Sequence, residues 1–114
     1  MTKLPTEVTT LVLELQRQLL TTIHETTATT FLLLERYGET EQSILFLDDF
    51  DNIRERANTY YSRFHTILLR IADAQLIVSN AMIKLLERSI NEAQATIDES
   101  EATINEEKRN WDLP

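Results

Sequence analysis

Glycine, proline and cysteine are almost missing from this sequence, which has one glycine, two prolines and no cysteine in 114 residues. An all-β domain needs frequent turns, and such turns draw on glycine and proline for their backbone angles. With Gly38 as the sole glycine and with prolines only at positions 5 and 114, the chain is predicted to be all-α. We expect a long helical hairpin with an extended C-terminal helix, packed as a coiled coil or helical bundle in a single domain over residues 1–114.

The same absences exclude several kinds of functional site. Without cysteine there is no disulfide, no thiolate metal site and no cysteine nucleophile, and a single glycine excludes a glycine-rich phosphate loop. The net charge of −8 argues against binding of nucleic acid, which needs clustered lysine and arginine. We therefore expect no cofactor and no nucleic-acid partner.

The chain is also predicted to have no membrane-spanning segment. Its most apolar window, Ile67 to Leu86, contains Arg70, Asp73 and Lys84, and ionised side chains are costly inside a bilayer. No basic-then-apolar signal stands at the start of the sequence. The cytoplasm is the expected location.

The first helix is predicted to run from about Thr6 to Tyr37, followed by a turn at residues 38–40. Pro5 suits a helix start, and Gly38 suits the left-handed position that ends a helix. A β-hairpin over residues 31–50 is the alternative. Because an isolated two-stranded ribbon is marginally stable and the apolar residues here do not alternate, helix ends are favoured.

Two stripes of apolar residues run through the remainder of the chain, from about residue 41 to residue 111. The first alternates spacings of four and three residues, as a coiled coil does: Ile53, Ala57, Tyr60, Phe64, Ile67, Ile71, Ala74, Val78, Ala81 and Leu85. The second recurs every seven residues: Leu69, Leu76, Ile83, Ile90, Ile97, Ile104 and Trp111. Between Ile67 and Leu86 the two stripes lie on nearly opposite faces, so this stretch is expected at the centre of the assembly.

A simple hairpin would leave the region from about Asp73 to Asp112 without a partner, an overhang of about 60 Å. Two arrangements would cover it. The chain bends again near Ala72 to Gln75 and forms three helices, or one helix continues and packs against a second copy. We favour the second, an antiparallel dimer with the seven-residue stripe as its self-association seam, because no turn residue marks the bend.

No metal or catalytic centre stands out. His24 and His65 are predicted to lie about 16 Å apart along the bundle, too far to share a metal ion, and Asp51 is expected to cap a helix that starts after the acids at 48–49. Arg17 and His24 are weak catalytic candidates. Their Arg-x6-His spacing covers eight residues and resembles an element of HEPN-type ribonucleases. The resemblance implies an RNA site at a dimer interface.

The expected function is a non-enzymatic module for helical oligomerisation and protein interaction, with a homodimer as the favoured assembly and another protein as a further partner. Two alternatives stay open. One is an RNA-processing helical bundle that uses Arg17 and His24 at a dimer interface. The other is an acidic chaperone or antitoxin-like inhibitor that covers a basic partner.

Overall fold

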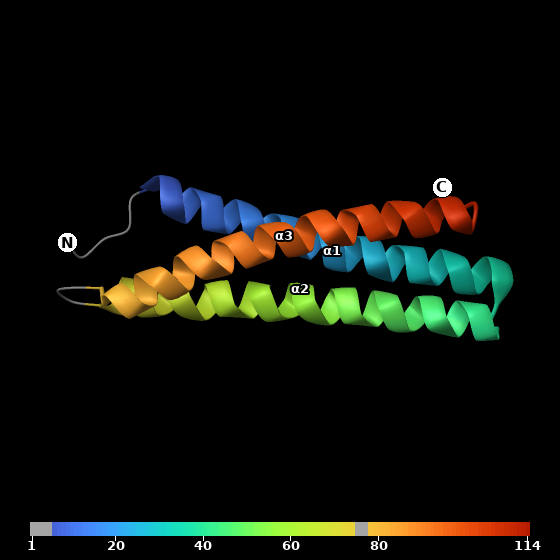
Figure 1. Ribbon diagram of the computed structural model, residues 1–114, viewed down its shortest axis with the longest axis horizontal. Helices are drawn as coiled ribbons and strands as arrows, with labels where there is room; N and C mark the ends of the chain where they lie inside the picture. The colour runs from blue at the N-terminus through green and yellow to red at the C-terminus, as the bar shows by residue number, and fades with distance from the viewer. Residues whose placement is uncertain (1–5, 75–77) are drawn as a thin grey trace.

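The computed structural model describes residues 6–74 and 78–114 and contains three helices in them. These are α1 (Thr6–Tyr37), α2 (Glu41–Asp73) and α3 (Asn80–Asn110). They run up, down and up in a narrow bundle of 56 × 20 × 17 Å (Figure 1). The predicted all-helical bundle is confirmed, and residues 31–50 lie in helices and their connection instead of a β-hairpin.

The connection between α1 and α2 is made by residues whose chemistry suits it. Gly38 has a φ of 71°, a left-handed angle that glycine adopts without strain, and its N–H donates to the Leu34 carbonyl at 2.9 Å. Thr40 then caps α2, since its hydroxyl accepts from the Ser43 N–H at 3.0 Å while the Ser43 hydroxyl accepts from the Thr40 N–H at 2.6 Å. This reciprocal capping box fixes the turn where the sequence places it.

The second connection corrects the prediction of one uninterrupted helix from about 41 to 111. Helix α2 ends at Asp73 and Ala74 is extended, while Ser79 caps α3 by accepting a hydrogen bond from the Met82 N–H at 3.2 Å. Extended backbone at Ala74 and a serine cap at Ser79 end one helix and start another without glycine or proline. The three-helix alternative is therefore the observed one; Gln75, the last residue of the predicted bend, lies outside the described residues.

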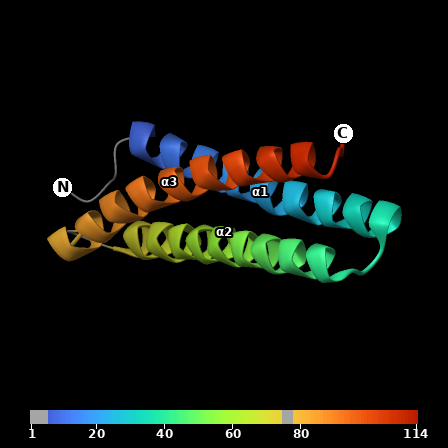
Figure 2. The ribbon, with the colours of Figure 1, turned by 45° about the vertical axis from the view of Figure 1, so that its right-hand side comes forward.

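The break also changes the place of residues 67–86 in the molecule. Both stripes cross this break: the first reaches Ala81 and Leu85 of α3, and the second starts at Leu69 of α2. Their overlap therefore does not form one helix with two apolar sides. Figures 1 and 2 show the end of α2 and the start of α3 side by side at one end of the bundle, not at its centre. The stripe that begins at Ile53 supplies the inner face of α2, where Ile53, Ala57 and Phe64 are buried.

The core consists of two apolar clusters, one toward each end of the bundle. The larger one gathers Val12, Leu15 and Leu19 with Phe64 and other residues of α2 and α3. The smaller cluster joins three helices near the first turn. Its buried members are Leu33, Phe46, Phe50, Ile53 and Ile104.

The threonine-rich part of α1 stays helical and packs into the interior. Thr22, Thr26 and Thr29 are all buried. The hydroxyls of Thr22 and Thr26 donate to carbonyls of their own helix, at 3.1 and 2.8 Å, so these polar groups are satisfied where water is excluded. Packing thus overrides the weak helix propensity of threonine. None of the described helices is long and apolar enough to span a membrane.

Phe64 and Phe31 provide a matched test of this core, because Phe64 is fully buried and Phe31 is 66% exposed. We expect Phe64→Ala to lower the free energy of unfolding by about 3–5 kcal/mol and Phe31→Ala to change it by less than about 0.5 kcal/mol. Urea unfolding followed by fluorescence of Trp111, the single tryptophan, measures both. Equal losses in the two variants would contradict this core.

Candidate interaction surface

The seven-residue stripe that we predicted as the self-association seam lies on the inner face of α3. Ile97 and Ile104 are buried, and Ile83 and Ile90 are half-buried against the larger core cluster. Leu69 belongs to α2 and is exposed, and Leu76 lies outside the described residues. The predicted overhang does not exist, because α3 folds back onto α1 and α2 and its own stripe residues are covered within one chain.

Trp111, the last member of the stripe, closes one end of the bundle. Its ring meets the Tyr37 ring edge-on at a centroid distance of 5.1 Å and the Phe46 ring at 6.0 Å. The Tyr37 hydroxyl donates to the Trp111 carbonyl at 2.7 Å, and the Arg36 guanidinium donates to the Asp112 carbonyl at 2.6 Å. These contacts fix the end of α3 against α1.

The histidines and acids are dispersed over the surface. His24 on α1 and His65 on α2 are both exposed, and no group of three metal-binding side chains is assembled within residues 6–74 and 78–114. Helix α2 runs without interruption through Asp51, so the prediction of a helix cap there is wrong. Its carboxylate instead pairs with Arg54, one turn further along the same helix.

Arg17 and His24, the weak catalytic candidates, both lie on the solvent side of α1. The Arg17 guanidinium is held by Glu14, with Nη2 to Oε1 at 2.6 Å and Nε to Oε2 at 2.9 Å. These hydrogen bonds, together with one from Gln18, lower the pKa of Glu14 to about 2. The arginine therefore faces a carboxylate that stays ionised at neutral pH.

A groove of about 530 Å³ lies between α1 and α3 beside Arg17. The buried side chains of Ile97 and Ile104 contribute to its lining, and the Lys108 ammonium binds the Glu25 carboxylate at 3.0 Å. The remaining lining is polar and includes two acids: Gln18, Thr21, Thr22, Asp98, Glu101 and Asn105. The groove gathers no set of groups that would activate a nucleophile or hold a metal ion.

The most distinctive surface is the side of α1 that faces away from α2 and α3. Leu13, Leu20 and Phe31 are 54%, 51% and 66% exposed. Spacings of seven and eleven residues bring all three within about 20° of one line along the helix. We call the exposed residues within about 60° of this line the α1 outer face: Thr6, Thr10, Leu13, Arg17, Leu20, His24, Thr27, Ala28, Phe31 and Glu35.

Exposed apolar side chains are distributed unevenly over the three helices. Among the described residues, nine large apolar side chains are exposed: Leu11, Leu13, Leu20, Phe31, Leu32 and Tyr37 on α1, and Ile44, Leu45 and Leu69 on α2. Helix α3 contributes none of them. A docking surface should therefore be sought on α1.

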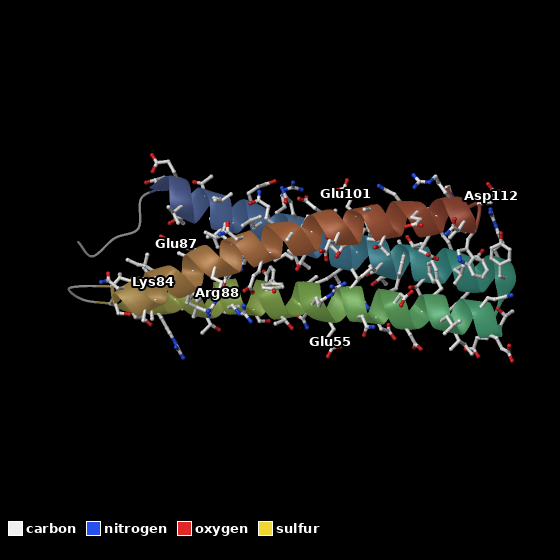
Figure 3. All side chains as sticks on the ribbon, viewed as in Figure 1. Glu55, Lys84, Glu87, Arg88, Glu101 and Asp112 are labelled. Atoms are coloured by element: carbon white, nitrogen blue, oxygen red, sulfur yellow. The ribbon has the colours of Figure 1, made fainter. Side chains whose placement is uncertain are left out.

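The charges follow the opposite distribution. The exposed charged side chains of α2 are six acids and two bases: Glu41, Asp48, Asp49, Asp51, Glu55, Asp73, Arg56 and Arg70. Those of α3 are five acids and three bases: Glu87, Asp98, Glu99, Glu101, Glu106, Lys84, Arg88 and Arg109. Figure 3 shows several of them, including Glu55, Glu87 and Glu101, directed into solvent. The α1 outer face carries only Arg17 and Glu35 and so has no net charge, counting His24 as neutral.

Sequence reasoning missed this face, although its signal was present. Leu13, Leu20 and Phe31 were not singled out as one line along the first helix. Placing all leucines on a helical wheel separates Leu13 and Leu20 from the buried Val12 and Leu19 by about 100°. The sequence pattern does not indicate which face of the first helix the other helices cover.

No protein-family model matches this chain. No curated protein and no solved structure is significantly similar to it.

Because Ile97 is buried, we expect its substitution to affect folding, whereas substitution in an exposed self-association seam would affect only the assembly of copies. We expect Ile97→Asp to unfold the chain, because an unpaired buried charge is costly, whereas Gln94→Asp on the exposed side of α3 leaves it folded. Circular dichroism and sedimentation of the two variants measure this. An Ile97→Asp chain that stays folded and only loses a partner copy would contradict the burial.

The pairing of Arg17 with Glu14 is open to a direct titration. We expect the Glu14 carboxyl to titrate with a pKa of about 2 and the Arg17→Ala variant to raise that pKa, because the arginine hydrogen bonds are the largest cause of the lowering. Carbon NMR of the carboxylates follows both. Gln18→Ala, which removes the second cause, should raise the pKa less; an unchanged value in Arg17→Ala would show that Arg17 is not engaged.

Proposed function

We propose that this chain is a non-enzymatic helical interaction module that binds a protein partner through the α1 outer face. The supporting observation is a line of three exposed large apolar side chains, Leu13, Leu20 and Phe31, on a face without net charge in a strongly acidic protein. Contiguous exposed apolar surface is typical of interaction sites. Depletion of charge together with an aromatic side chain is typical of the centre of an interface.

The shape of this face restricts the kind of partner. It is the convex side of a single helix, about 27 Å long from Leu13 to Phe31. A partner must therefore offer another apolar helix face or an apolar groove into which a helix fits. Such contacts are made by anchors at spacings of three, four and seven residues, and the spacing of Leu13 and Leu20 meets this requirement.

The acidic surface of α2 favours a second candidate function, an inhibitor or chaperone for a basic partner. Six exposed acids against two exposed bases on this helix would attract a basic protein over its length. The two functions differ in salt dependence, because surface charge attraction is screened as ionic strength rises while apolar contact persists. Binding that persists at about 1 M salt supports the α1 outer face.

The RNA-processing alternative depends on Arg17 and His24 and has its own test. Arg17 is bound to Glu14. Arg17 and His24 are about 10 Å apart along the helix. Purified protein is incubated with single-stranded RNA beside an Arg17→Ala/His24→Ala variant. Cleavage by the parent that the double variant loses would replace the interaction module as the leading function.

The interaction module is tested by photo-crosslinking in an extract of the native host. A benzophenone amino acid replaces Leu20 on the α1 outer face or, as a control, Ala102 on the exposed side of α3. We expect protein adducts, either with another protein or with a second copy, from position 20 only, because only this side chain lies in the proposed interface.

Substitution within the face supplies the matched control for this experiment. Leu13→Gln with Phe31→Gln should abolish the adducts formed from position 20 while leaving the helical content unchanged, since both side chains are exposed. Adducts from position 102 alone, or from neither position, would contradict the proposal.

A further inference from the structure

We infer that the partner of the α1 outer face is a second copy of this chain, which binds with its α1 antiparallel to the first across a two-fold axis. This inference rests on the proposed function and names the partner of the same surface. This interface differs from the seven-residue stripe, mostly on α3, that the sequence predicts as the self-association seam. It requires only residues that are exposed in the single chain.

The spacing of the apolar residues is self-complementary. Leu13 and Phe31 are eighteen residues apart, five full turns of helix, so both point along the same line from one side of α1. With the two-fold axis level with residue 22, Leu13 of each copy lies level with Phe31 of the other. Leu20 of each copy then lies level with His24 of the other, so the pairs 13–31 and 20–24 each occur twice, as an isologous contact requires.

The charges select the antiparallel orientation over the parallel one. A parallel pair would place Arg17 against Arg17 and Glu35 against Glu35, and like charges that face each other across an interface are unfavourable. In the antiparallel pair Arg17 lies level with Thr27 of the other copy, and Glu35 lies level with Thr9. No two like charges meet.

The net charge of the chain selects this face over the others. Each copy carries −8, and the exposed charges of α2 and α3 are both negative in sum. Two copies that met through either of those helices would bring acidic surfaces together. The α1 outer face, with one base and one acid, is where two copies meet with least repulsion.

The size of the face sets the strength of the contact. Three large apolar side chains from each copy, spread over about 27 Å of a single helix, form a contact below the roughly 800 Å² per partner of a standard stable interface. We therefore expect a reversible dimer whose population rises with concentration. The monomer is folded, because its core is complete without the partner.

Sedimentation equilibrium over micromolar to millimolar concentration tests the assembly. We expect the mass to rise from 13.3 kDa toward twice that value, and Leu13→Gln/Phe31→Gln to weaken dimerisation at least tenfold. The matched control is Leu69→Gln/Leu45→Gln, whose side chains are 52% and 68% exposed but lie on α2. This control should dimerise as the parent does.

Crosslinking between two different single-cysteine chains tests the register. The chain has no cysteine, so a Leu13→Cys chain mixed with a Phe31→Cys chain offers only engineered thiols to a short bismaleimide. We expect covalent dimers in the mixture and few in either chain alone. Dimers of the Leu13→Cys chain with itself would overturn the antiparallel register.

The outcomes separate this inference from the proposed function. A chain that stays monomeric at every concentration, or a dimer that the Leu13→Gln/Phe31→Gln variant retains, overturns self-association through α1. If the benzophenone at position 20 then still captures a different protein, the interaction module stands without the dimer. If it captures nothing, both fail.

Discussion

Burial of the α3 stripe between α1 and α2 is the contact on which the rest of the bundle depends. Ile97 contributes to the larger core cluster together with Leu86 and Ala93, and Ile104 contributes to the smaller one. Without α3, the parts of α1 and α2 that contact its apolar side chains would be open to water, and a two-helix hairpin of this length has no second apolar surface to cover them. Which side of α1 stays exposed follows from where α2 and α3 pack against it.

Polar contacts along the edges of the bundle add alignment more than stability. The Glu92 carboxylate accepts a hydrogen bond from the Tyr60 hydroxyl at 3.0 Å and lies 3.4 Å from the Arg63 guanidinium, which ties α3 to α2. Burial and the nearby carboxylate raise the pKa of Tyr60, so its hydroxyl stays protonated as a donor. Partly exposed ion pairs contribute about 0–1 kcal/mol each, so the apolar contacts remain the main source of stability.

The uneven surface is a consequence of this packing combined with the sequence of α1. Three helices in a bundle each expose one side, and in α2 and α3 that side is mainly polar and charged. In α1 it carries Leu13, Leu20 and Phe31 instead. Burial of apolar area is the main favourable contribution to the free energy of association. A partner that covers this line buries apolar area without removing many charges from water.

The sequence by itself determined the helical class, the C-terminal end of the first helix and the turn after it, because Gly38, Thr40 and the apolar spacing act locally. It also marked the side of α3 that is buried, through Ile97 and Ile104. It did not determine whether Asp73 ends a helix: a serine cap at Ser79 competes with helix continuation, and the free energy of burying the α3 stripe decides between them. Only the tertiary structure could therefore turn that stripe from a predicted surface into core, and leave Leu13, Leu20 and Phe31 as the apolar side chains without a covering helix.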